Sequence, residues 1–343
     1  MYRFIRALAL FVVLALVAGC GGATPIASAP TAPAGSSAPA SAVPDPALAE
    51  LRLDYATYSP PSLVLRKKGW VEEAFAGTTI KWVYSAGSSN ALNFLQANAV
   101  DFGSTAGSAA LLSRANGNPI KVVYIYEQPE WTALVVAASS TAKDIRDLRG
   151  KKIAAQKGTD PYFFLLRTLS AAGLSQADIQ YVNLSHADGR TALERGQVDA
   201  WSGLDPHMAA SELAAGSKLI YRNKDFNTYG FLNSREDFLR RYPETTKKLI
   251  LLYERAKSWI VDNLDQAAQI LADDAQIGLE VAKRELFDRM NFRTPSIPGA
   301  THIAVLSAVV PIIAAEQLAN PGANVEKAVT DLVDGSYARA VLK

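Results

Sequence analysis

Residues 152–161 read KIAAQKGTDP, a short apolar run that passes through a glycine turn into a proline. The run 152–155 has the length of a buried β-strand, and Pro161 is well placed for the first turn of a helix. Gly158 lets another group approach the backbone closely, and the hydroxyl of Thr159 can cap the helix. The stretch therefore predicts a strand, a turn and a helix in succession.

The same order of elements repeats along most of the chain. Strands are predicted at residues 51–56, 80–84, 122–126, 134–137, 152–155, 179–183, 200–202 and 231–233. Helical patterns lie between them, as at 89–99, and they dominate after Ser234. The clearest is 243–262, which has a proline in its first turn and an apolar stripe along one side. The alternation is typical of α/β folds with mostly parallel sheets, here followed by a helical tail.

Three other turns that lead into predicted helices have similar chemistry. They are rich in serine, with glycine or threonine, and they span residues 57–62, 84–89 and 102–108. In an open α/β sheet such turns lie at the carboxyl ends of strands, where ligands bind. The free N–H groups and partial positive charge of helix N-termini can hold an anion there. Each turn alone is an ordinary helix cap, but their repetition favours an anion site. No phosphate loop or dinucleotide fingerprint occurs.

The first twenty residues have the features of a secretory leader. Arg3 and Arg6 precede an uncharged run, 7–18, which is shorter than the ~20 apolar residues of a membrane-spanning helix. The run ends in Val-Ala-Gly before Cys20, which resembles a bacterial lipobox. We therefore expect residues 1–19 to be a signal peptide and Cys20 to carry lipid. The alternative is a plain signal peptide with a free cysteine near its end.

Composition divides the remainder into a tether and a folded body. Residues 20–48 are mostly Ala, Pro, Ser, Gly and Thr, which predicts a disordered tether. The rest is long enough for two lobes of ordinary domain size. Removal of Arg3 and Arg6 leaves 33 of the 35 basic residues, which equals the 33 acidic residues. This balance of positive and negative charge gives no indication of a surface that binds nucleic acid. After the leader, no further apolar run is long enough to span a membrane.

Six segments form a recognisable series between residues 51 and 343. They are VDFGST at 100–105, AQKGT at 155–159, LLRTLSAAGL at 165–174, QVDAW at 197–201, DP at 205–206 and FLRRYPE at 238–244. In order and spacing they resemble segments of the solute-binding proteins of ABC importers for aliphatic sulfonates, taurine and nitrate.

The resemblance implies the type II periplasmic-binding-protein fold, an α/β fold with two lobes around a ligand cleft. In this fold the chain crosses between the lobes twice, and we place the crossings at 138–141 and 228–233. Lobe 1 would then combine residues 49–140 with 229–343, and lobe 2 would be residues 141–228.

By the same resemblance, the oxyanion head of the ligand lies between the turns. The residues expected around it are Tyr58, Ser59, Ser88, Ser89, Ser104, Thr105, Gly158 and Thr159. Asp205 matches an acidic residue that faces the other end of the ligand, although it can equally be a helix cap before Pro206. The tryptophan usual in the family just before this Asp-Pro is Leu204 here. Gln128 precedes the first crossing and either reaches the cleft or lies at the surface.

The implied function is capture of a small organic anion, sulfonate- or taurine-like, outside the cytoplasm. The partners would be an ABC permease with a cytoplasmic ATPase and, through the lipid, a membrane. We expect a monomer with no cofactor, metal, nucleic acid or catalytic residue. His186, His207 and His302 are too dispersed to predict a metal site, and Trp131 and Trp201 either line an apolar wall or belong to the core. Alternatives are a same-fold enzyme of the thiamine-pyrimidine type, or a binding protein for a thiamine precursor, nitrate or an aromatic carboxylate.

Overall fold

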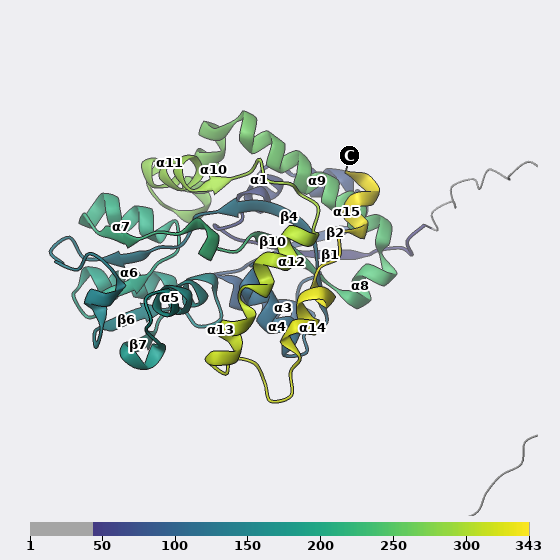
Figure 1. Ribbon diagram of the computed structural model, residues 1–343. Coiled ribbons are helices and arrows are strands. Elements are labelled where there is room, and N and C mark those ends of the chain that lie inside the picture. Colours follow the sequence, from purple (N-terminus) through teal and green to yellow (C-terminus); the bar gives the residue numbers. More distant parts are fainter. Residues whose placement is uncertain (1–43, 343) are drawn as a thin grey trace, which may run out of the picture. The chain divides into compact units, whose positions relative to one another are not determined.

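The computed structural model describes residues 44–342, which belong to one compact unit (Figure 1). The predicted signal peptide 1–19, the predicted lipidation site Cys20 and most of the predicted tether 20–48 lie outside the described residues. None of the described helices combines the length and apolar character that a membrane crossing requires.

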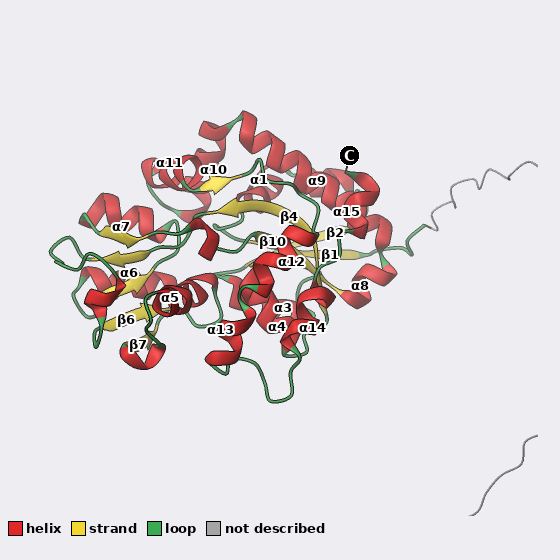
Figure 2. Cartoon of the chain, viewed as in Figure 1, coloured by secondary structure: helices red, strands yellow, loops and turns green. Residues whose placement is uncertain are grey.

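The first sheet contains six strands (Figure 2). They are β1 (Glu50–Tyr55), β2 (Thr79–Tyr84), β3 (Phe102–Ala106), β4 (Ile120–Pro129), β10 (Gly230–Arg235) and β11 (Met290–Asn291). Their order is β11-β4-β10-β3-β1-β2. β1 runs parallel to β2 and β3, whereas β10 runs antiparallel to β3 and β4. The carboxyl ends of β1, β2 and β3 therefore lie along one side of this sheet.

The second sheet contains five strands. They are β5 (Leu134–Val136), β6 (Lys152–Ala155), β7 (Gln180–Asn183), β8 (Ala200–Ser202) and β9 (Lys218–Tyr221). Their order is β7-β6-β8-β5-β9. β6 runs parallel to β7 and β8, and β5 runs antiparallel to β8 and β9.

Helices cover both faces of each sheet. The α-helices are α1 (Pro60–Lys68), α2 (Trp70–Ala74), α3 (Ser88–Gln96), α4 (Gly107–Ala115), α5 (Asp160–Ala171), α6 (His186–Glu194), α7 (His207–Ala215), α8 (Glu236–Arg241), α9 (Pro243–Asp262), α10 (Leu264–Ala275), α11 (Leu279–Asp288), α12 (Ala300–Ser307), α13 (Val310–Ala315), α14 (Val325–Leu332) and α15 (Ser336–Val341). Short 3₁₀ turns are η1 (Ile145–Leu148), η2 (Gln176–Asp178) and η3 (Lys224–Phe226).

The core follows from the alternation of side chains along each strand. In β10, Leu232 packs into the core formed with α1, α9 and α10, and its neighbour Phe231 packs into the core formed with α4, α12 and α14. In β6, Ile153 packs toward α5 and Ala154 belongs to the core beside α6. These strands are therefore buried on both faces, and residues 122–126 of β4 accordingly form a continuous apolar run.

The α/β architecture predicted from the sequence is confirmed, but the expectation of mostly parallel sheets is corrected, because both sheets are mixed. The strand pairing also moves the first predicted crossing. β5 already pairs with β8 and β9, so the chain leaves the first sheet between Pro129 and Leu134, ahead of 138–141. It returns between Tyr221 and Gly230, so the second predicted crossing, 228–233, is also corrected, because residues 230–233 belong to β10. The division into two lobes stays a proposal, with the second lobe now beginning near Leu134.

Asp45, which the prediction placed in the tether, is bound to the folded body. Its carboxylate oxygens accept hydrogen bonds from the backbone N–H groups of Glu244, at 3.0 Å, and Thr245, at 2.6 Å. These groups belong to the first turn of α9, where N–H groups have no partner inside the helix. The predicted tether would therefore end before Asp45.

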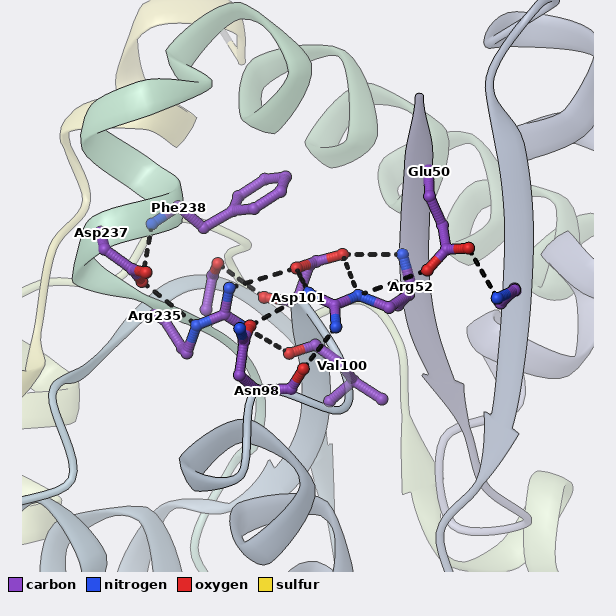
Figure 3. A network of polar contacts seen from close by, with 10 residues as sticks. Glu50, Arg52, Asn98, Val100, Asp101, Arg235, Asp237 and Phe238 are labelled. Carbon is purple, nitrogen blue, oxygen red and sulfur yellow. Dashed lines mark hydrogen bonds and ion pairs between the residues drawn. The ribbon is translucent and has the colours of Figure 1, made fainter. Parts of the chain in front are cut away.

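A buried ion-pair network fixes the start of β3 (Figure 3). Asp101 accepts hydrogen bonds from the backbone N–H of Arg52 at 2.8 Å, from its Nη2 at 2.7 Å, and from Nη2 of Arg235 at 3.2 Å. Arg235 also donates to the carbonyl oxygen of Val100, and Arg52 to that of Asn98. The network joins β1, β3 and β10, and so positions the carboxyl end of β3 where predicted site residues lie.

Candidate functional site

A small cavity is lined by residues from both sheets and from the first crossing. Its wall is formed by Tyr58, Ser88, Ala106, Trp131, Thr159, Asp160, Pro161, His186 and Leu204. The cavity volume is about 10 Å³, which is room for about one water molecule. The structure therefore brings the carboxyl-end turns of the two sheets into contact, with very little space left between them.

Three helices begin on this wall, and one of them is α6, which starts at His186. α3 starts at Ser88 and α5 starts at Asp160. The first N–H groups of a helix have no partner inside it, and the helix dipole adds a partial positive charge at the same place. Neither N-cap residue, Gly87 or Thr159, supplies a side-chain hydrogen bond to its helix. The cavity thus receives the N-termini of α3 and α5, which the serine- and glycine-rich turns predicted, together with that of α6.

The turns 84–89 and 156–161 meet across the two sheets. Ser89 Oγ lies 3.3 Å from the carbonyl oxygen of Lys157 and 3.2 Å from that of Gly158, and can donate to either. Gly158 has φ +77°, and a Cβ at this position would lie 3.2 Å from Ser89 Oγ. Glycine is therefore favoured at position 158 for two reasons. It adopts the positive φ without strain, and its missing side chain lets Ser89 approach the backbone closely.

Four of the predicted head-group residues are together at this place. Ser88 and Thr159 lie on the cavity wall, and Ser89 and Gly158 make the contact beside it. The hydroxyl of Ser88 accepts a hydrogen bond from the backbone N–H of Ala106 at 2.9 Å. The hydroxyl of Thr159 donates to the carbonyl oxygen of Gln156 at 2.7 Å, which orders the turn itself.

Asp160 joins all the parts of the chain that meet here. Its Oδ1 accepts hydrogen bonds from the hydroxyls of Ser108, at 2.5 Å, and Thr228, at 2.8 Å. Its Oδ2 accepts from Nε1 of Trp131, at 3.0 Å, and from the backbone N–H of Thr228, at 2.8 Å. Ser108 lies on α4 beside the first sheet, and Trp131 and Thr228 lie on the two crossings. Both carboxylate oxygens are therefore fully used by the protein.

His186 is the second wall residue with unusual surroundings. It is the first residue of α6 and is 4% exposed, and neither ring nitrogen has a hydrogen-bond partner. Its backbone N–H donates to Oε1 of Gln156 at 3.2 Å. Burial, together with the nearby His207, lowers the pKa of His186 to about 3. The imidazole is therefore neutral near pH 7.

The remaining predicted head-group residues lie on the first-sheet side. Tyr58 is on the cavity wall, donates to the carbonyl oxygen of Ser104 at 3.1 Å, and packs edge-on against Trp131. Ser59, Ser104 and Thr105 are buried away from the wall. The hydroxyl of Thr105 accepts from Asn233 Nδ2 at 2.8 Å, whereas the hydroxyls of Ser59 and Ser104 have no partner.

The expectation that Asp205 faces a ligand is corrected. Its Oδ1 and Oδ2 each lie 2.7 Å from Nη1 of Arg289, and Oδ1 also accepts from the backbone N–H of Ala209 at 2.9 Å. Arg289 pairs with Glu212 as well. The carboxylate therefore caps the first turn of α7 and holds a buried ion pair, which agrees with the cap alternative. The neighbouring Leu204 does lie on the cavity wall.

Gln128 is not on the cavity wall either. It is half-buried in β4, opposite Asn291 of β11. The preceding Glu127 is completely buried, and neither of its carboxylate oxygens has a partner. Burial raises the pKa of Glu127 well above its usual range, although nearby Lys257 opposes the change. Gln128 therefore takes a sheet position, and the buried acid is its neighbour.

Another buried acid lies at the end of β1. Asp54 accepts a hydrogen bond on Oδ1 from the backbone N–H of Ser104 at 2.9 Å, and its Oδ2 has no partner. Burial raises the pKa of Asp54 to about 7, against the hydrogen bond from the backbone N–H of Ser104, which lowers it. This group is therefore close to its titration point near neutral pH.

Sequence reasoning missed Asp160 and His186 as site residues. Asp160 is visible in the sequence as an acid between a glycine-threonine turn and a proline, but this pattern predicts no separate role for it. His186 follows a predicted strand and Ser185, as a residue that begins a helix would. Each of the two residues begins a helix directly after a turn at the carboxyl end of a strand. This position in the sequence is the only sign by which they could have been found. The sequence allows both Trp131 and Trp201 either on an apolar wall or in the core. Trp131 lies on the cavity wall, and Trp201 lies in the core beside α6.

Comparisons with known proteins place these features in a family. Residues 56–267 match the family model described as NMT1/THI5 like. A candidate aliphatic sulfonates-binding protein of Bacillus subtilis (strain 168) is 27% identical over 244 residues, which cover 70% of this chain and 74% of the relative. A second candidate aliphatic sulfonates-binding protein, from Escherichia coli (strain K12), is 32% identical over 181 residues, 52% of this chain and 57% of the relative.

Solved structures agree with the sequence relatives. The alkanesulfonate-binding protein SsuA from Xanthomonas axonopodis pv. citri, bound to MOPS, aligns with a TM-score of 0.74 and 25% identity. The alignment covers 83% of this chain and 99% of that chain. The periplasmic nitrate-binding protein NrtA from Synechocystis PCC 6803 has a TM-score of 0.72 at 11% identity, covers 87% of this chain and 89% of that chain, and so shows the shared fold. The resemblance to sulfonate-binding proteins is confirmed, and the chain belongs to the NMT1/THI5-like family.

Proposed function

We propose that this protein is the extracytoplasmic solute-binding component of an ABC importer and captures a small organic monoanion of the sulfonate type. The observation that carries the proposal is the meeting of two helix N-termini, α3 and α5, at one cavity between the sheets. Free N–H groups at such termini bind oxyanions. The names of the relatives and of the solved neighbour bound to MOPS support a sulfonate.

The charge of the wall favours a monoanion. The wall residues include no lysine or arginine, and they include the carboxylate of Asp160. Asp160 is already satisfied by four donors, so the helix N–H groups remain for a ligand. Neutral donors beside a carboxylate stabilise one negative charge more readily than two. A sulfonate carries a single charge at neutral pH and three acceptor oxygens.

Capture requires the two sheets to separate. A cavity of about 10 Å³ cannot admit a sulfonate group. Hinge motion about a few connecting residues is the usual way in which periplasmic binding proteins open and close. Here the connections are residues 130–133 and 222–229, so we propose that these segments form the hinge. Closing around the anion would then present the second lobe to the permease.

The proposal concerns capture without chemistry by a monomer. The ligand should therefore leave the protein unchanged, as judged by mass spectrometry of the released molecule. A thermal-shift screen followed by calorimetry would use ethanesulfonate, taurine, MOPS, nitrate, sulfate and benzoate. We expect micromolar or tighter binding of at least one sulfonate and weaker binding of sulfate. Binding of benzoate or nitrate alone would replace the sulfonate assignment, and binding of none would overturn the proposed function.

The membrane attachment is a separate part of the proposal. Cys20 is the sole cysteine in the chain and follows a charged and then apolar leader. Two acyl chains give stable membrane residence, whereas one alone binds marginally. Replacement Cys20→Ser should leave an uncut precursor or release the protein into the soluble fraction. Unchanged processing and membrane partitioning would contradict lipid attachment and leave the ligand assignment untouched.

A further inference from the structure

The imidazole of His186 lies where the two sheets meet at the cavity. It begins α6 on the second-sheet side and forms part of the wall with Ser88 and Thr159. Facing it is Gly87, the residue before α3, at φ +139°. A Cβ at Gly87 would lie 3.4 Å from Nε2 of His186, so the missing side chain lets the ring edge lie directly against the backbone that leads into α3.

The ring has polar atoms that the protein does not use. His186 is 4% exposed, and neither Nδ1 nor Nε2 has a hydrogen-bond partner among the described residues 44–342. Buried side-chain polar atoms normally have a partner, and an exception in a native structure calls for an explanation. A neutral imidazole offers one N–H donor and one acceptor. The same wall contains the N-terminus of α3, so an unused donor and free helix N–H groups meet at one place.

The buried histidine His302 provides a contrast. It is also 4% exposed, but its Nδ1 accepts a hydrogen bond from the backbone N–H of Gly299 at 3.2 Å. It packs against Tyr229 and Phe231 and is not on the cavity wall. An equally buried histidine of this chain is therefore partly satisfied by the fold, whereas His186 is not.

We propose that His186 is a ligand-binding residue, whose imidazole donates one N–H hydrogen bond to an oxygen of the captured anion from the second-sheet side. The inference rests on the proposed function and adds a donor opposite the N-terminus of α3. Because this donor is neutral, it recognises the acceptor oxygens of a monoanion and adds no positive charge that would favour a dianion. Contact through His186 would also join the anion to both sheets in the closed state.

Calorimetry with the sulfonate that binds wild type most tightly in the screen would test the role. His186→Leu should bind it about 10- to 100-fold more weakly, which corresponds to loss of one hydrogen bond to a charged group. His186→Gln, whose amide N–H reaches a similar position, should restore part of the affinity. His302→Leu is the matched control, with the same substitution at an equally buried histidine, and should keep the wild-type affinity.

Nuclear magnetic resonance gives a second test, because it follows the imidazole rings of the wild-type protein directly. The chain has three histidines, so a ¹⁵N-histidine spectrum is simple to read. Addition of the same sulfonate should shift the ring signals of His186, identified with His186→Gln, and leave those of His302 in place.

The outcomes separate the two proposals. If no anion of the screen binds the wild-type protein, the proposed function fails and this inference fails with it. If wild type binds but His186→Leu binds equally well and the His186 ring signals do not move, the function stands and the role of His186 is overturned. Weaker binding by His186→Leu with wild-type binding by His302→Leu supports the assignment.

Discussion

The hydroxyl of Ser108 lies 2.5 Å from Oδ1 of Asp160, and this hydrogen bond joins a helix beside the first sheet to a helix beside the second. The same carboxylate accepts from Trp131 and twice from Thr228, which lie on the two crossings. One buried side chain therefore holds together both connections and both sheets. A group in this position should contribute to the stability of the closed arrangement more than any one of its partners.

Replacement of Asp160 should test that expectation. In Asp160→Asn one oxygen becomes an NH₂ group, which faces donors and cannot accept their hydrogen bonds. Urea unfolding should show a loss of stability about twice that of Ser108→Ala, because hydrogen bonds to a charged group contribute about 1.5–3 kcal/mol each. Ser108→Ala is the control, since it removes one donor and leaves the crossings bound. Equal losses in the two variants would mean that the crossing contacts contribute nothing.

The pair Arg289 and Asp205 gives a prediction about selectivity. Both oxygens of Asp205 lie 2.7 Å from Nη1 of Arg289, and both side chains are buried. Asp205→Asn should therefore lower stability and leave the ratio of affinities for taurine and ethanesulfonate unchanged. Arg289→Met should cost about 3–5 kcal/mol, because it leaves the carboxylate buried without its partner.

Calorimetry of Asp205→Asn with both sulfonates, and urea unfolding of Arg289→Met, are the measurements. A changed preference between the two sulfonates in Asp205→Asn would restore a ligand-facing role for this residue. A loss in Arg289→Met no larger than that of an exposed ion pair, about 1 kcal/mol, would contradict a buried pair.

Local pattern was enough to place several elements. The strand β6, Lys152–Ala155, and the helix α9, Pro243–Asp262, have the limits that the sequence predicted. Each depends on signals within a few residues, such as an apolar run before a glycine turn or a proline in a first helical turn. The serine- and glycine-rich turns were also found, because helix N-termini have a local signature.

Features that depend on distant residues could not be predicted in the same way. β3, Phe102–Ala106, is made of small and polar residues that read as a turn, and it is a strand because β1 and β10 pair with it. Asp205 forms an ion pair with Arg289, which lies 84 positions away in the chain. Asp160 binds Trp131 and Thr228, which lie on the two crossings and are distant from it in the chain. The residues next to Asp160 in the sequence give no sign of these contacts.

Asp54 should make stability depend on pH. Its pKa is raised to about 7 by burial, whereas in the unfolded chain it has the ordinary value of 3.8. Between these values the folded state holds a proton that the unfolded state has lost, so this contribution to stability falls as pH rises from about 4 to 7. Asp54→Asn does not titrate there. The variant should therefore gain about 1 kcal/mol per pH unit relative to wild type over that range, and nothing further above it.

Urea unfolding of wild type and Asp54→Asn at pH 5, 6, 7 and 8 would measure the difference directly. Comparison of the two proteins at each pH cancels the titration of groups they share, including the three histidines. A difference that stays constant from pH 5 to 7 would show that Asp54 is not buried as described.

Gly158 allows the effect of backbone strain to be separated from the effect of closure. It has φ +77°, and Gly173 has φ +72°, so alanine at either position should cost about 1–2 kcal/mol of stability. A Cβ at Gly158 would lie 3.2 Å from Ser89 Oγ on the other side of the site, whereas a Cβ at Gly173 would meet nothing within 4 Å. Only Gly158→Ala should therefore oppose closing around the anion.

The measurement is calorimetry of both variants with the sulfonate that wild type binds most tightly, alongside thermal unfolding of the same samples. Gly158→Ala should bind about 10-fold more weakly, which corresponds to about 1.4 kcal/mol, and Gly173→Ala should keep wild-type affinity. Both should lose similar stability, because the strain is present whether or not the two sheets have closed. Wild-type affinity in both variants would remove the turn at Gly158 from the closing surface. Equal and large losses of affinity would instead show that general destabilisation, and not the contact with Ser89, governs binding.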